Sequence, residues 1–222
     1  MLAALLVVAL AGSASVPAAP TRWLEDHAGF LSPAAANSLD GKLAAYEHAT
    51  GHQVVVWIDR TIGGADLADW AARTFAAWKL GRKGLDDGVA LFIFTDDRTI
   101  DIEVGYGLED KIPDAIASRI IREVMTPRLQ SGDADGAVSA GIDATLTAIE
   151  GKPWTATGTA GPAPTPLWQW IAYGALGLGT LVLLIVNPRL LWVFAMMIGR
   201  GGAGGFMGGG GRSGGGGARG RW

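Results

Sequence analysis

The amino-acid sequence predicts an α/β fold with a mixed sheet and a βαββ core. Three observations carry this prediction. Residues 54–58 and 89–94 are continuous apolar runs, typical of strands that are buried on both faces under helices. Between them, residues 65–79 carry apolar side chains at helical spacing, which completes a strand–helix–strand unit. Residues 99–104 alternate apolar and polar side chains, which predicts an edge strand with one covered and one solvated face.

A helix is predicted over residues 33–50, ahead of this core. Ser32 is a good N-cap, Pro33 suits the first helical position, and Gly51 is a typical stop. Apolar side chains recur at spacings of three and four, the pattern of one helical face: Leu39, Leu43 and Tyr46.

Two further helices are predicted after the strand pair. Pro113 opens the first, which directs Ile116 and Ile120 to the core, and Thr126-Pro127 interrupts or ends it. Asp133 caps the second helix. The folded domain therefore covers residues 22–150, a length that can bury one core.

The remaining segments predict export and membrane attachment. Residues 1–18 resemble a signal peptide that ends in Val16-Pro17-Ala18; a buried N-terminal helix or strand is the alternative. Residues 151–166 are rich in proline, glycine and threonine, which predicts an extended linker. Residues 167–186 form a stretch of 20 residues without a charge, the length of a transmembrane helix, and an apolar continuation reaches residue 198.

Arginines after residue 186 set the predicted orientation. By the positive-inside rule they place the tail in the cytoplasm and the folded domain outside it. This predicts a cell-envelope protein that crosses the inner (cytoplasmic) membrane once, with a periplasmic domain. A membrane hairpin that includes residues 190–198 is the alternative, and it puts the tail outside. Residues 199–222 are predicted to be a disordered Gly/Arg tail, either simply solubilising or in contact with anionic lipid.

Charge and composition exclude several classes of function. Residues 22–150 hold 21 acidic and 12 basic residues, a net charge of −9, whereas the residues after 150 hold six basic residues and no acid. The acidic folded part argues against nucleic-acid binding, which needs a basic face. The chain has no cysteine, which excludes disulfide frameworks, thiolate metal sites and cysteine nucleophiles.

A β-hairpin over residues 89–104 brings two acidic, glycine-bearing loops together. Its strands are antiparallel, so the loop before residue 89 meets the loop after residue 104 at one edge of the sheet. Carboxylates there suit a hard cation such as Ca²⁺ or Mg²⁺. Aspartate and glycine are also ordinary turn formers, which is the competing interpretation. The candidate metal ligands are Asp86, Asp87, Glu109, Asp110 and Asp114, and the glycines of the motif are Gly88, Gly105 and Gly107.

Nucleophilic catalysis has no legible basis in the sequence. Ser118 and Ser139 lie in predicted helices without a His/Asp partner pattern. The histidines show no metal-ligand spacing. A hydrolase built on this chain would therefore rely on metal and carboxylates.

The chain resembles the TPM domain family, in its bacterial membrane-anchored type with a signal peptide and a C-terminal Gly-rich tail. The resemblance covers residues 24–149 and rests on four stretches. They are Asp26-x-Ala28-Gly29-x-Leu31-Ser32, Trp78-Lys79-Leu80-Gly81-Arg82-x-x-x-Asp86-Asp87-Gly88-Val89, Arg98 with Ile102-Glu103-Val104-Gly105-Tyr106-Gly107-Leu108-Glu109, and Gly132-Asp133.

The resemblance implies a small α/β/α sandwich with its sheet between helices. It also implies divalent-cation binding in some members, and it adds Asp26 to the candidate metal ligands. Relatives include a thylakoid acid phosphatase and photosystem II repair proteins, so weak phosphatase activity is implied for some members. We therefore expect a membrane-tethered extracytoplasmic binding or accessory domain, binding a divalent cation, that supports the maintenance or assembly of membrane protein complexes. The alternative is a metal-assisted acid phosphatase.

Overall fold

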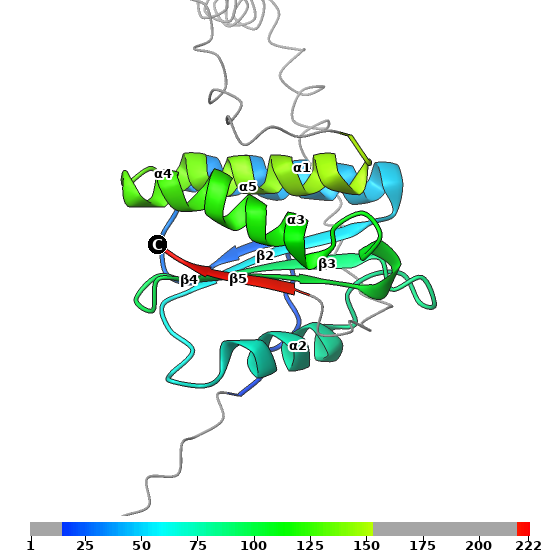
Figure 1. Ribbon diagram of the computed structural model, residues 1–222, viewed down its shortest axis with the longest axis horizontal. Coiled ribbons are helices and arrows are strands. Elements are labelled where there is room, and N and C mark those ends of the chain that lie inside the picture. The colour runs from blue at the N-terminus through cyan, green and yellow to red at the C-terminus, as the bar shows by residue number, and fades with distance from the viewer. Residues whose placement is uncertain (1–14, 153–216) are drawn as a thin grey trace, which may run out of the picture. The chain divides into compact units, whose positions relative to one another are not determined.

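The centre of the fold is a five-stranded mixed sheet in the order β1-β2-β3-β4-β5 (Figure 1). The computed structural model describes residues 15–152 and 217–222. The strands β1, β2 and β3 are parallel, and β4 and β5 are each antiparallel to the strand before them in this order. Their bounds are Leu24–Asp26, Gln53–Asp59, Gly88–Phe94, Thr99–Val104 and Gly217–Arg221.

Helices cover both faces of this sheet, which confirms the predicted α/β fold (Figure 1). On one face lie α1 (Pro33–Thr50), α3 (Asp114–Arg119), α4 (Thr126–Gln130) and α5 (Ala134–Ile149). On the other lies α2 (Leu67–Trp78). The bounds of α1 agree with the prediction, because Ser32 accepts a hydrogen bond from the Ala35 backbone N–H and Gly51 ends the helix at a φ of +79°.

The two faces of the sheet bury separate cores. Alternate strand residues such as Val56 and Leu91 pack under α1 and α5, and the intervening residues Trp57 and Phe92 pack with α2. Both faces of β2 and β3 are therefore apolar, which is why their sequences read as continuous hydrophobic runs.

The predicted third helix is divided into three pieces. A π-helical segment η2 (Ile120–Met125) joins α3 to α4, and Pro127 lies in the first turn of α4. A proline at that position removes no helical hydrogen bond of α4 itself, so the chain can start a new helix there. Thr126-Pro127 thus interrupts the helix, as expected.

The edge of the sheet differs from the prediction at β4. All six residues of β4 are buried, including Asp101 and Glu103, which were expected to face solvent. β5 pairs along β4, so β4 is an interior strand, and α2 covers the face that carries Asp101 and Glu103. Residues 217–221 therefore belong to the sheet, and the expectation of a disordered tail is wrong for them. Alternation predicted one wet face because the sequence does not reveal the distant strand.

Several predictions concern residues outside the described ranges. Most of the expected signal peptide, nearly all of the linker and the whole apolar stretch of 167–198 fall in 1–14 and 153–216. Within 15–152 and 217–222, none of the helices combines the length and the apolar character needed to cross a bilayer.

Candidate functional site

The two acidic loops at the start of β3 and the end of β4 lie together, as the hairpin predicts. Val89 pairs with Val104, so the residues flanking them are neighbours. Just beyond this pair, the Gly105 N–H donates to the Gly88 carbonyl at 2.8 Å and the Gly107 N–H donates to the Asp86 carbonyl at 3.1 Å. A 3₁₀ turn, η1 (Tyr106–Leu108), follows directly.

Glycine is required where these loops touch. A Cβ at Gly105 would lie 2.1 Å from the Asp86 carbonyl oxygen, and one at Gly107 would lie 2.0 Å from the Leu85 carbonyl oxygen. Backbone atoms cannot yield as a flexible side chain does. The Gly-Tyr-Gly spacing therefore serves close backbone packing between the loops.

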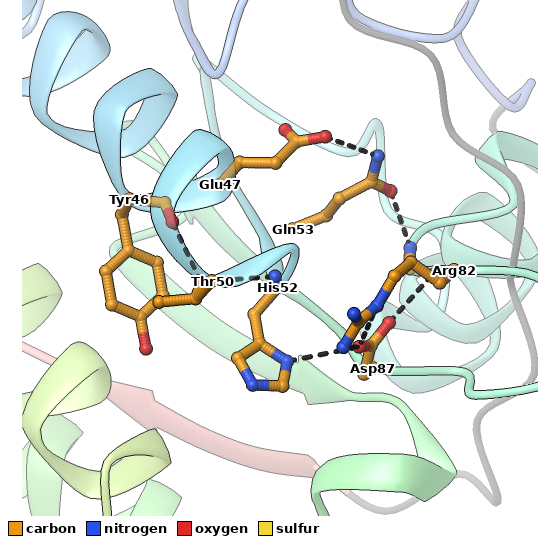
Figure 2. A network of polar contacts seen from close by, with 8 residues as sticks. Tyr46, Glu47, Thr50, His52, Gln53, Arg82 and Asp87 are labelled. Atoms are coloured by element: carbon orange, nitrogen blue, oxygen red, sulfur yellow. Dashed lines mark hydrogen bonds and ion pairs between the residues drawn. The ribbon is translucent and has the colours of Figure 1, made fainter.

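Asp87 is the buried anchor of this junction (Figure 2). Its Oδ1 accepts from the Arg82 backbone N–H at 2.7 Å, and its Oδ2 accepts from Arg82 Nε at 2.7 Å and from Arg82 Nη2. The His52 Nδ1 lies 3.1 Å from the same Oδ2. Asp87 therefore holds the loop 79–88 closed on itself and on the start of β2.

A second set of hydrogen bonds ties the same loop to α1 (Figure 2). Gln53, the first residue of β2, accepts from the Gly81 N–H at 2.7 Å and donates to Glu47 Oε1 at 2.9 Å. The other oxygen of Glu47 accepts from the Trp23 indole N–H. These contacts link the loop, β2, α1 and the segment before β1 into one rigid polar network.

Electrostatics keep Asp87 ionised in this setting. Burial alone would raise the pKa of Asp87, but the hydrogen bonds from Arg82 and the charges of Arg82 and His52 outweigh it and hold the pKa below its usual value. Both carboxylate oxygens are occupied by protein donors. Asp87 is thus a structural carboxylate in this arrangement.

Asp26 lies at the other end of the sheet. It is the last residue of β1 and pairs with Ile58 near the end of β2, whereas Asp87 precedes the start of β3. Its carboxylate accepts from the backbone N–H groups of Ala28, Phe30 and Leu31 at 2.8–3.1 Å. Its role is to shape the turn into α1, which the sequence alone did not indicate.

The other predicted ligands surround the loop junction without converging. Asp86 is half-buried with a φ of +48°, and Glu109 follows η1. Asp110 is exposed beside Lys111, with 3.6 Å between Oδ2 and Nζ, and Asp114 is exposed in the first turn of α3. Among residues 15–152 and 217–222, no three His, Asp or Glu side chains are grouped closely enough to hold a metal ion.

This donor set does not fit the divalent cation that the resemblance implies. A calcium site needs six to eight oxygen ligands and a magnesium site needs a near-octahedral shell. Asp26 and Asp87 already accept from protein N–H groups, and the two lie at opposite ends of the sheet. The predicted six-residue set is therefore not one site.

Comparison with known proteins identifies the fold's family. A family model described as the TPM domain matches residues 24–148. The chain belongs to the TPM domain family. The TPM domain here is similar to the solution NMR structure of the N-terminal domain of a protein from P. gingivalis, with 32% identity and a TM-score of 0.53, covering 59% of this chain and 83% of that chain. It is also similar to the NMR structure of the BA42 protein from the psychrophilic bacterium Bizionia argentinensis, with 21% identity and a TM-score of 0.49, covering 59% and 89%. Among the curated proteins compared, none matches.

Two exposed apolar side chains of the TPM domain were not predicted from the sequence. Leu85 and Tyr106 are 52% and 53% exposed, although every other large hydrophobic side chain in the described part of the chain is at least partly buried. They stand on the two loops that Gly105 and Gly107 bring into contact. We define Leu85 and Tyr106 as the apolar tip. In the sequence, a large leucine and a large tyrosine stand among turn-forming residues, and this placement could have indicated their exposure.

A pair of buried acids on β4 was also missed. Asp101 and Glu103 are fully buried on the face covered by α2, and the Arg219 Nε lies 2.9 Å from Asp101 Oδ1. The pKa of Asp101 is raised to about 8, mainly by burial; the charge of Arg219 opposes this rise and the charge of Glu103 adds to it. Two parts of the fold make these residues interior: α2 covers their face, and β5 beside β4 brings Arg219 to Asp101.

Proposed function

We propose that this TPM domain is a membrane-tethered, extracytoplasmic binding module that contacts a membrane protein or complex through the apolar tip. The single observation that carries the proposal is the exposure of Leu85 and Tyr106 on two loops whose backbones are in contact. Large apolar side chains that remain exposed together on a folded surface mark interaction sites. Leucine and tyrosine on a rigid support are suited to fill a partner's pocket.

The support beneath the tip is rigid. Asp87 receives four polar contacts from Arg82 and His52, and Gln53 fixes the Gly81 backbone. A loop held in this way loses little conformational freedom on binding, so more of the interaction energy appears as affinity.

Acidic residues around the tip indicate the chemistry of the partner. Asp110 and Asp114 are exposed, and Asp86 and Glu109 are half-buried, within the same loop cluster. The charge pattern disfavours an anionic lipid surface and favours a protein with an apolar pocket and a basic rim. This agrees with a role in the maintenance or assembly of membrane protein complexes.

A metal-assisted phosphatase, the alternative expectation, draws less support from the site. That reaction needs carboxylates free to hold a cation. The carboxylate oxygens of Asp87 already contact Arg82 and His52, and those of Asp26 already accept hydrogen bonds from backbone N–H groups. Calorimetry with Ca²⁺ and Mg²⁺ tests this directly: a saturable heat that Asp86→Asn and Glu109→Gln abolish would restore the cation site.

The location of the domain is part of the proposal. The predicted signal peptide and apolar stretch support attachment at the cell envelope, with the domain outside the cytoplasm. The pairing of β5 with β4 supports the membrane hairpin rather than the single crossing, because one crossing would separate two strands of one sheet. The tail is then extracytoplasmic like the domain.

A photo-crosslinking experiment tests the binding surface. A photoreactive amino acid replaces Tyr106 in the full chain in native membranes; the matched control carries it at Ala45, an exposed position of α1. The proposal expects a discrete adduct from position 106 that Leu85→Ser removes. Equal adducts from both positions, or an adduct indifferent to Leu85→Ser, would refute the tip as the binding surface.

Cysteine labelling tests the topology. Because the chain has no cysteine, Ala45→Cys and Trp222→Cys each introduce a unique thiol. Both should react with a membrane-impermeant maleimide in spheroplasts before lysis. A thiol at position 222 that reacts only after lysis would contradict the hairpin and the extracytoplasmic tail.

A further inference from the structure

The edge of β4 is covered by a segment from the far end of the chain. Residues 217–221 pair with 103–99 along five positions, from Glu103 with Gly217 to Thr99 with Arg221. The stretch between the domain and this strand, residues 153–216, is 64 residues long. β5 is therefore far from β4 in the sequence and is held at β4 by the contacts it makes there.

The pairing is specific for side chains as well as for backbone. On the face toward α2, Arg219 approaches the buried Asp101 carboxyl at 2.9 Å. On the opposite face, Ala218 is buried in the main core, and a Cβ at Gly220 would lie 2.4 Å from Ile121 Cγ2. A side chain at position 220 would therefore clash with Ile121. The Asp101 carboxyl favours a positively charged side chain at position 219.

The last residue adds a third point of recognition. The Trp222 backbone N–H donates to the Arg98 carbonyl at 3.3 Å, and its ring lies 6.3 Å from the Phe30 ring. Beside the strand, Arg219 and Arg221 line an open cavity of about 630 Å³ together with Asp66 and Asp97. Acidic groups of the domain thus face the basic groups of the strand.

The buried carboxyl of Asp101 makes the β4 edge selective for the strand that pairs with it. A carboxyl with no exposed surface is costly to bury unless it has a partner. The Arg219 guanidinium, with its Nε 2.9 Å from Asp101 Oδ1, is the group that brings a positive charge to it. A strand without arginine at that position would leave Asp101 beside Glu103 without that charge.

From these contacts we infer that the β4 edge is a strand-acceptor site for an extended, arginine-bearing C-terminal segment. Its resident ligand is residues 217–222 of the same chain, held exchangeably, so that a free segment of the same chemistry can displace it. Main-chain hydrogen bonds supply affinity, and Asp101, Ile121 and Phe30 supply selectivity. The inference does not depend on the apolar tip, which lies on other residues.

Disulfide trapping in the full chain tests this site. Thr99→Cys with Arg221→Cys places the only two thiols of the chain at paired positions, and directly opposed residues of antiparallel strands are within disulfide reach. Mild oxidation should give an intramolecular disulfide. The control pair Thr99→Cys with Arg212→Cys should give far less. A disulfide-linked dimer would overturn the assignment of the chain's own tail, and no disulfide would overturn the strand pairing.

Competition tests exchange and selectivity. Attachment to the same chain gives the segment an effective concentration on the order of millimolar. A synthetic peptide with the sequence of residues 217–222, added before oxidation at about ten times that level, should slow disulfide formation about ten-fold. The same peptide carrying Arg219→Glu should slow disulfide formation little. In a full chain that also carries Asp101→Asn, the two peptides should slow disulfide formation to more similar extents. Equal rates with and without the first peptide would overturn the exchangeable site.

Discussion

Asp87→Ala gives a quantitative test of the loop junction. The change removes a buried carboxylate that accepts from the Arg82 backbone, the Arg82 guanidinium and His52. The Arg82 side chain is 46% exposed, so water can take over the guanidinium and moderate the loss. Removing one partner of a buried charge pair costs about 3–5 kcal/mol, and the exposure of Arg82 places the expected loss near 3 kcal/mol. For a domain of this size, this lowers the melting temperature by roughly 10 °C.

The sign of the pH dependence makes the test sharper. The folded-state pKa of Asp87 is depressed, so its stabilising contribution is present above the unfolded pKa of about 4 and is lost as the pH falls through the folded value. The difference between wild type and Asp87→Ala should therefore be full at neutral pH and shrink in acid.

Thermal unfolding of the full chain in mild detergent, followed by tryptophan fluorescence, measures this difference. Asp87→Asn is the matched control, since it keeps the size and an acceptor oxygen and should lose less. Two results would refute the reasoning: a melting temperature lowered by less than about 3 °C at neutral pH, or a difference that grows in acid.

The other predictions concern packing and the buried acid. Gly105→Ala should lower the melting temperature sharply because its Cβ would lie 2.1 Å from the Asp86 carbonyl oxygen, whereas Gly41→Ala, with open space around it in α1, should leave it unchanged or raise it. Circular dichroism melts of the two variants compare them, and equal melts would contradict the close approach. Leu43→Ala, at a position only 1% exposed, should cost about 2–5 kcal/mol in denaturant titrations; a loss below about 1 kcal/mol would contradict its place in the core. The raised pKa of Asp101, about 8 in the folded state, means that the folded chain keeps a proton that the unfolded chain releases. The contribution of Asp101 to stability should then be fully present below its unfolded pKa of about 4 and decline by up to roughly 5 kcal/mol as the pH rises to 8. The denaturant midpoint should fall as the pH rises across this range, and Asp101→Asn should remove this fall. A fall that is unchanged in Asp101→Asn would show that other groups cause the pH dependence.

Local sequence signals predicted most of the fold. The helix bounds at 33 and 50 follow from Ser32 and Gly51, whose capping contacts depend only on near neighbours. The two apolar runs predicted interior strands because periodicity reports burial on both faces. The hairpin then placed its two loops together by geometry alone.

Long-range partners could not be predicted in the same way. The alternation of β4 suggested a wet face, but α2 covers that face and the distant strand β5 brings Arg219 to Asp101. The carboxylate of Asp87 looked like a metal ligand because the sequence does not show that Arg82 folds back onto it. Charged side chains read alike in a sequence whether they bind ligands or hold loops, and only their partners distinguish the two roles.

The position of β5 sets the order in which the sheet can be completed. About half of the chain separates β4 from β5, so β5 is synthesised well after β4. Until then the backbone N–H and C=O groups along the edge of β4 lack their strand partner, and open edges of this kind pair readily with other chains. Only a chain that includes residues 217–221 can close its own sheet, so a product cut short anywhere between residues 153 and 216 keeps an aggregation-prone edge. Residues 217–221 thus complete the sheet only after the rest of the domain has been made.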